Sequence, residues 1–135
     1  DYSVKMNIEK YGLEKHVNYI GYVPHGEVIE YQKKANLLLL MINNTPNAKG
    51  IITGKVFEYI ASKRPILVVG PEDGDLSTII NTTKSGIVCG FDDVKKLKLT
   101  LLRLYNNEII FEPNPAAYSR KSLTKKLSEI LNQLT

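Results

Sequence analysis

The residues best suited to chemistry lie where a long polar loop, residues 43–53, runs into the segment Gly54-Lys55-Val56. Thr53 and Gly54 would leave free amide groups at the start of a helix, where the helix dipole also favours an anion. Lys55 adds a cation close to them. This combination suits a phosphate or a diphosphate. A Thr53 side chain that only caps the helix, with Lys55 on the surface, accounts for the same residues.

Glu58 is the acidic residue nearest to this helix start, and its sequence neighbours are apolar. A carboxylate in such surroundings is costly to bury unless it accepts hydrogen bonds. The two vicinal hydroxyls of a ribose would supply them, as they do for an acidic residue in dinucleotide-binding folds. The alternative is an exposed Glu58 that pairs with Lys55 or Lys63.

The elements that must position these residues alternate between helix and strand. Helical spacing predicts helices over residues 1–12, 26–35, 54–62, 75–81, 92–106 and from 119 onward, and apolar runs predict strands over 17–23, 37–42, 66–69 and 86–89. The helix over 92–106 should be capped by its Asp and should bury Val94, Leu97, Leu101 and Leu104.

The alternation predicts an α/β fold with a doubly wound, Rossmann-like parallel sheet. The run 37–42 has no polar alternation, so we place it at the centre of that sheet. Ligands of such sheets bind beyond the carboxyl ends of the strands, where the loop 43–53 belongs. Because the chain opens with a helix, we expect the sheet to lack its first strand.

Composition bounds the function further. The 135 residues, 43 % hydrophobic and 24 % charged, predict one globular domain spanning residues 1–135. The longest apolar run, residues 37–42, is far shorter than the roughly 20 residues of a membrane span. The net charge is +4, but basic and acidic residues interleave, so we expect no nucleic-acid partner. Mild basicity would suit an anionic small ligand or an anionic membrane surface.

Cysteine and histidine exclude other kinds of site. Cys89 lies in an apolar stretch and is expected to be a buried core thiol, consistent with a reducing, cytoplasmic environment. His16 and His25 have no companion ligands nearby, so we expect no metal site.

The run TGKVFEYIASKRPIL, residues 53–67, resembles the nucleotide-sugar-binding segment of bacterial GT-B glycosyltransferases of the retaining, group 1 (family 4) type. Residues 20–25 with Tyr31 and 37–40 resemble the strand, helix and strand before that segment. Residues 70–75 with 79–80 and 86–88 resemble the loop, helix and strand after it. The resemblance covers nearly the whole chain and implies the C-terminal, donor-binding half of a GT-B fold, without its N-terminal acceptor domain.

The resemblance also implies roles for individual residues. Glu58 would bind the ribose hydroxyls of the donor, and residues 53–55 would face its diphosphate. Tyr22 and Val23 would border the base.

One position departs from the family pattern. Many members carry a second Glu, eight positions before the ribose Glu, which contacts the donor sugar, and that position is Gly50 here. Contacts to the sugar would therefore fall to Asn44, Lys49 or backbone amides such as that of Gly50.

The implied activity is sugar transfer from a nucleoside diphosphate sugar to a hydroxyl of a polysaccharide or lipid-linked glycan. The resemblance favours uridine diphosphate over guanosine diphosphate as the leaving group, and implies retention of configuration without a metal or other cofactor. Since the acceptor domain would form the other wall of the cleft, we expect this chain alone to lack turnover. The full-length enzyme would be cytoplasmic and associated with the membrane.

Two other functions remain open from the sequence. One is half of a nucleotide-sugar 2-epimerase, which shares the GT-B architecture. The other is a non-catalytic, flavodoxin-like regulatory module such as a receiver domain. A receiver would require an acidic cluster after an early strand and a Lys after the last strand, and neither is apparent.

Overall fold

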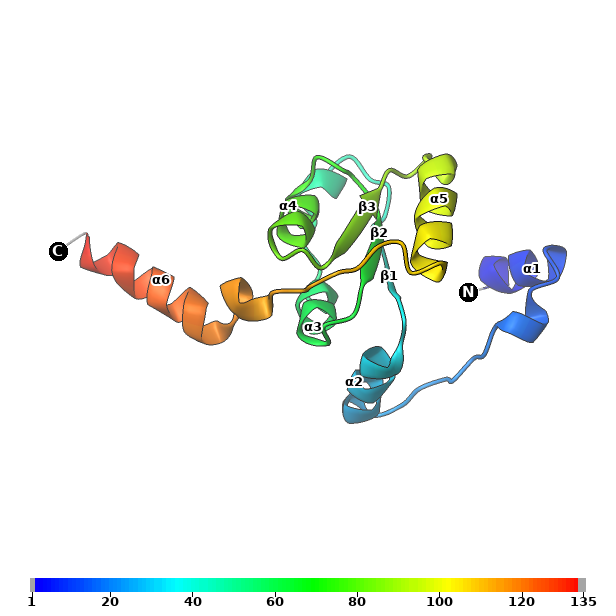
Figure 1. Ribbon diagram of the computed structural model, residues 1–135, viewed down its shortest axis with the longest axis horizontal. Coiled ribbons are helices and arrows are strands. Elements are labelled where there is room, and N and C mark those ends of the chain that lie inside the picture. The colour runs from blue at the N-terminus through cyan, green and yellow to red at the C-terminus, as the bar shows by residue number, and fades with distance from the viewer. Residues whose placement is uncertain (1, 134–135) are drawn as a thin grey trace.

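The computed structural model describes residues 2–133. Its helices and strands are α1 (Tyr2–Lys10), α2 (His25–Lys34), β1 (Leu38–Met41), α3 (Lys55–Ala61), β2 (Ile66–Val69), α4 (Asp75–Thr82), β3 (Gly86–Cys89), α5 (Val94–Tyr105) and α6 (Arg120–Asn132). Short 3₁₀ helices are η1 (Glu14–His16), η2 (Ala48–Gly50) and η3 (Pro115–Tyr118). The strands form one parallel sheet in the order β1-β2-β3 (Figure 1).

Helices cover both faces of this sheet, which confirms the doubly wound α/β class. On one face, Val56 and Ile60 of α3 and Ile80 of α4 pack on strand residues such as Val68. Helix α5 lies on the opposite side from α4 (Figure 1). There Cys89 is fully buried, as expected, with its Sγ 4.0 Å from Oγ1 of Thr100.

Local signals set several helix ends. Gly12 adopts the left-handed conformation, φ +63°, just after α1, where a side chain would be strained. The Asp93 side chain accepts a hydrogen bond from the amide of Lys96 at 2.9 Å, and this cap starts α5. Ser119 caps α6 in the same way through the amide of Ser122. The expected helices therefore form within one or two residues of their predicted bounds.

The prediction that residues 37–42 form the central strand is wrong for the described sheet. β1 pairs with β2 alone, whereas β2 pairs on both sides. The side chains of β1 alternate between buried and exposed, and both Leu39 and Met41 are exposed. Among the described residues, the main sheet contact of α5 is with β3, and the Leu39 and Met41 side chains of β1 stay exposed.

The predicted strand over residues 17–23 is also wrong. This segment has no strand structure, and Gly21 adopts φ +76° within it. The Tyr22 side chain is 99 % exposed. Strand-forming residues need a neighbouring strand to accept their hydrogen bonds and pack their side chains, and residues 17–23 have none in the described chain.

The burial predicted for α5 is only partly correct. Leu97 and Leu104 are half-buried, but Val94 and Leu101 are exposed. The buried residue of α5 is Thr100, which faces β3 through Cys89. Helix α5 has the expected periodic apolar stripe. The side of the helix that meets the sheet carries Thr100, however, and Val94 and Leu101 of the stripe stay exposed.

Gly86 allows β3 to approach β2 closely, since a Cβ built there would collide with the carbonyl oxygen of Ile66. We expect Gly86→Ala to lower the free energy of unfolding by roughly 3 kcal/mol or more, the upper end of overpacking costs. Urea denaturation followed by circular dichroism measures this change. The matched control is Gly26→Ala in α2, where no atom lies within 4 Å of the new Cβ. There we expect a gain of about 0.5–1 kcal/mol. A mild loss at Gly86 would contradict this packing.

Candidate functional site

A pocket of about 600 Å³ lies between β1 and the beginning of α3. Its walls combine an apolar strand with a polar helix start, and the lining residues are Leu39, Leu40, Met41, Thr53, Gly54, Lys55, Glu58 and Tyr59. The pocket therefore brings together the four predicted residues Thr53, Gly54, Lys55 and Glu58. It lies where the loop after β1 enters the next helix, the usual ligand position in a parallel sheet.

The start of α3 offers unpaired backbone donors. Gly54 occupies the N-cap position, and no side chain caps the helix. The amides of Val56 and Phe57 bond to the carbonyl oxygens of Thr53 and Gly54, each at 3.2 Å, whereas the Gly54 and Lys55 amides bond to nothing in the described chain. The alternative that Thr53 serves as the helix cap is therefore wrong. Free amides at this position suit an anionic oxygen.

The hydroxyl of Thr53 is buried and has no hydrogen-bond partner among the described residues. A buried hydroxyl without a partner costs about 1–3 kcal/mol. Thr53 is also one of the residues that line the pocket, so this unpartnered hydroxyl lies beside it.

Lys55 brings positive charge to the same pocket. Its side chain is exposed, and it forms no ion pair within residues 2–133. The charge is therefore not neutralised by the protein and remains available to an anion.

Glu58 is exposed, as the alternative expected, and is not buried among its apolar sequence neighbours. The alternative pairing with Lys55 or Lys63 does not form in the described chain either. Its hydrogen-bond partner in the described chain is Nε2 of Gln32 in α2, which donates to Oε2 across a long 3.5 Å. The carboxylate thus lines the pocket with most of its accepting capacity unused.

The loop before α3 is held by the next loop along the sheet. Nζ of Lys49 donates to Oδ2 of Asp73 at 2.6 Å, and this hydrogen bond lowers the pKa of Asp73. The pair therefore contributes its stability above the ordinary Asp pKa and loses it as the pH falls through the lowered value. Gly74 packs so tightly on Lys49 that a Cβ there would lie 2.9 Å from the Lys49 carbonyl oxygen.

The residues predicted to contact the donor sugar are not among those lining the pocket. Lys49 is engaged with Asp73, Asn44 is exposed, and Gly50 ends η2. Nothing lies within 4 Å of a Cβ built at Gly50, so a side chain at this position would begin in open space.

The predicted base contacts, Tyr22 and Val23, do not line the pocket either. The apolar wall consists instead of Leu39, Met41 and Tyr59, which the sequence reasoning missed. The continuous apolar run of residues 37–42 does not indicate that the side chains on one face of β1 are exposed. Strand alternation applied to residues 38–41 would have separated Leu39 and Met41 from their buried neighbours.

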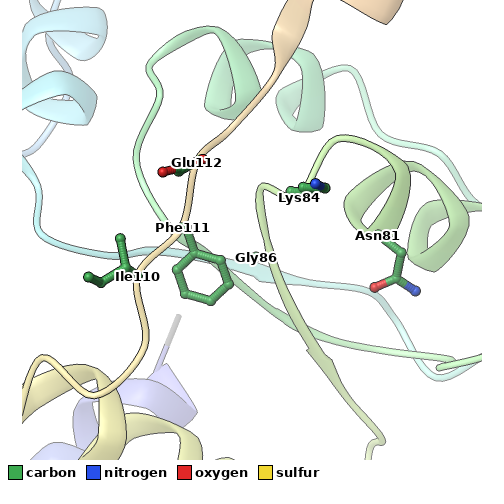
Figure 2. Close-up of a pocket in the computed structure, with 6 residues that line it drawn as sticks. All are labelled: Asn81, Lys84, Gly86, Ile110, Phe111 and Glu112. Atoms are coloured by element: carbon green, nitrogen blue, oxygen red, sulfur yellow. The ribbon is translucent and has the colours of Figure 1, made fainter.

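A second hollow of about 400 Å³ lies at the opposite end of the sheet, by the first residue of β3 (Figure 2). Figure 2 shows Phe111 and Glu112 on the strand-like connection after α5, beside Gly86, with Lys84 and Asn81 across from them. It contains neither a helix start nor an unpartnered buried hydroxyl. Its chemistry is therefore less suited to an anionic ligand.

Within residues 2–133, the acidic residues outside the pocket form ion pairs or do not gather into a cluster that could hold a metal ion. Glu72 forms an ion pair with Lys96, and this hydrogen bond raises the pKa of Lys96. Within residues 2–133, no group of three or more His, Cys, Asp or Glu side chains is arranged to hold a metal ion. No helix of the described chain is both long enough and apolar enough to cross a membrane.

The unpartnered hydroxyl makes a direct stability prediction. We expect Thr53→Val to raise the free energy of unfolding by about 1 kcal/mol, because it removes a buried donor that has no acceptor. The matched control is Thr83→Val, since the Thr83 hydroxyl is buried but bonded to the Ile79 carbonyl oxygen at 2.7 Å and to Ser85 Oγ at 2.8 Å. That change should cost about 1–3 kcal/mol. Thermal denaturation of both variants measures the two changes in stability. A comparable loss of stability at both positions would contradict the conclusion that the Thr53 hydroxyl has no partner.

Comparison with protein families shows what the chain is similar to. The model of the family "Glycosyl transferases group 1" matches residues 1–125. No curated protein and no solved structure gave a match. Because the family match spans nearly the whole chain and includes every element of the sheet, the chain belongs to the group 1 glycosyl transferases.

Proposed function

We propose that this chain is the donor-binding domain of a retaining glycosyltransferase that works without a metal ion. The full enzyme would transfer a sugar from a nucleoside diphosphate sugar to a hydroxyl of a polysaccharide or lipid-linked glycan. One observation carries the proposal: a single pocket joins free amides, an unpartnered hydroxyl and a lysine at a helix start to the carboxylate of Glu58. Family membership supports the reaction type.

The diphosphate binds at the beginning of α3. The amides of Gly54 and Lys55 donate to phosphate oxygens, and so does the Thr53 hydroxyl, which has no other acceptor in the described chain. The Lys55 ammonium neutralises part of the charge. Negative charge develops on the diphosphate as the sugar leaves, so the same groups favour the transition state as well as the bound donor.

The nucleoside lies toward Glu58 and the apolar wall. The carboxylate accepts hydrogen bonds from the two ribose hydroxyls in place of the long contact from Gln32. Leu39 and Met41, exposed on β1, offer apolar side chains to the base. Uridine diphosphate is the favoured nucleotide and guanosine diphosphate the second choice.

The remaining wall of the cleft comes from an N-terminal acceptor domain. Within residues 2–133 the pocket is lined by β1, Thr53 and α3 with its N-cap Gly54, and in this proposal the acceptor domain supplies the wall that faces them. The chain by itself therefore binds nucleotide but performs no turnover. A cytoplasmic location in a bacterium follows from the family resemblance and stays a prediction.

Calorimetric titration with uridine diphosphate tests the ribose assignment. We expect Glu58→Gln to weaken binding roughly tenfold or more, because a neutral amide replaces a charged acceptor of two hydroxyls. Glu27→Gln in α2 removes the same charge from another exposed glutamate outside this pocket and should leave the affinity unchanged. Equal binding by wild type and Glu58→Gln would remove Glu58 from the site. Circular dichroism of both variants verifies that each is folded.

A further inference from the structure

The hollow of about 400 Å³ at the first residue of β3 lies between two segments of the chain (Figure 2). One is the turn between α4 and β3, which carries Lys84. The other is the connection between α5 and η3, which carries Phe111 and Glu112. The volume falls within the range of small-molecule pockets, roughly 300–1,000 Å³. The nucleotide pocket lies at the other end of the sheet, so the function proposed above gives this hollow no role.

Backbone groups fix these two segments relative to each other. The amide of Asn114 donates to the carbonyl oxygen of Thr83 at 2.8 Å, and Thr83 is fully buried. Pro113 and Pro115 flank Asn114 and restrict the backbone on both sides of this hydrogen bond. The shape of the hollow is therefore set by the chain before any ligand binds.

Opposite charges line this hollow without neutralising each other. Lys84 and Glu112 come from the two different segments, as Figure 2 shows. Neither side chain forms an ion pair within residues 2–133, so the gap between them is too wide for direct contact. Two opposite charges held apart in one hollow are complementary to a molecule that itself carries both charges close together.

Apolar groups lie beside these charges. Figure 2 shows the ring of Phe111 next to Gly86, and this side chain is half-buried. Ile110 also lines the hollow and is 85 % exposed. A ligand held by the two charges would therefore find an aromatic ring and an aliphatic side chain within the same hollow, both suited to an apolar substituent.

We propose that this hollow binds a small zwitterion, of the class of free amino acids with an aromatic or aliphatic side chain. The Lys84 ammonium donates to the carboxylate of the ligand, and Glu112 accepts from its ammonium group, both as charge-assisted hydrogen bonds. The side chain of the ligand packs on Phe111. A nucleoside diphosphate is excluded from this hollow, because it has no ammonium group for Glu112 and its negative charge is repelled by that carboxylate.

Titration of the ¹⁵N-labelled chain with L-phenylalanine tests this proposal. We expect a dissociation constant in the millimolar range, because both charged contacts are partly solvated, with the largest amide shifts at Lys84, Phe111 and Glu112. 3-Phenylpropionate lacks the ammonium group and 2-phenylethylamine lacks the carboxylate, so each should bind roughly fivefold more weakly or worse. Equal binding of either analogue would overturn the proposal. So would the absence of shifts at these amides with tens of millimolar L-phenylalanine.

Variants that remove one charge each test the two named contacts. Lys84→Gln and Glu112→Gln should each weaken the binding of L-phenylalanine by roughly fivefold or more. Lys63→Gln is the matched control for the lysine, since Lys63 is also exposed and left-handed, φ +57°, but lies outside this hollow. Glu27→Gln is the control for the glutamate. Both controls should bind as wild type does, and an equal loss in controls and test variants would contradict the assignment.

The same variants separate this proposal from the proposed function. Lys84→Gln and Glu112→Gln should bind uridine diphosphate as wild type does, because neither residue lines the nucleotide pocket. Well-dispersed amide spectra verify that each variant is folded. The amino-acid result and the nucleotide result can therefore fail independently.

Discussion

Hydrogen bonding of β2 on both sides is the constraint on which the rest of the structure depends. Ile66 to Val69 pair with β1 on one edge and with β3 on the other, in unbroken parallel register. Parallel neighbours require a crossover after each strand, and α3 and α4 provide these on one face of the sheet. The start of α3 is thereby brought beside β1, where Lys55 and Glu58 line one pocket with the strand. Gly86 permits the close approach of β3 that completes this arrangement.

The pocket is built from groups whose bonding is incomplete in the chain itself. The amides at the start of α3 and the Thr53 hydroxyl have no acceptor among the described residues, and Glu58 has only the distant amide of Gln32. The loop before α3 is, by contrast, held against the next loop by the close packing of Gly74 on Lys49, with the exposed Lys49–Asp73 pair beside it. Because this loop is held in place, the unsatisfied donors at the start of α3 are preorganised and need little reorganisation when an anion binds.

The sequence predicted the elements whose signals are local. Strands 66–69 and 86–89 match their predicted bounds, because each is a short apolar run enclosed by turn-forming residues. The helix start at residues 53–55 was likewise placed correctly from its Thr-Gly-Lys order. In each case the residues that determine the structure are adjacent in the chain.

Features that depend on distant neighbours were not predictable in this way. Residues 17–23 have strand composition but no partner strand in the described chain, and Leu39 and Met41 on one face of β1 stay exposed. The exposure of Glu58 depends on how α2 and α3 pack, which its apolar sequence neighbours do not reveal. The apolar wall of the pocket was missed for the same reason. A periodic pattern identifies the apolar stripe of a helix such as α5, but it does not show which side of that helix will contact the sheet.

The central claim is that the anion-binding groups of the pocket act at the beginning of α3. The most direct measurement is a titration of the ¹⁵N-labelled chain with uridine diphosphate, followed by amide chemical shifts. We expect the amides of Gly54 and Lys55 to shift most, together with that of Thr53, while those of Asn81 and Lys84 at the opposite end of the sheet stay unchanged. Shifts centred on Asn81 and Lys84, with none at Gly54 and Lys55, would contradict it.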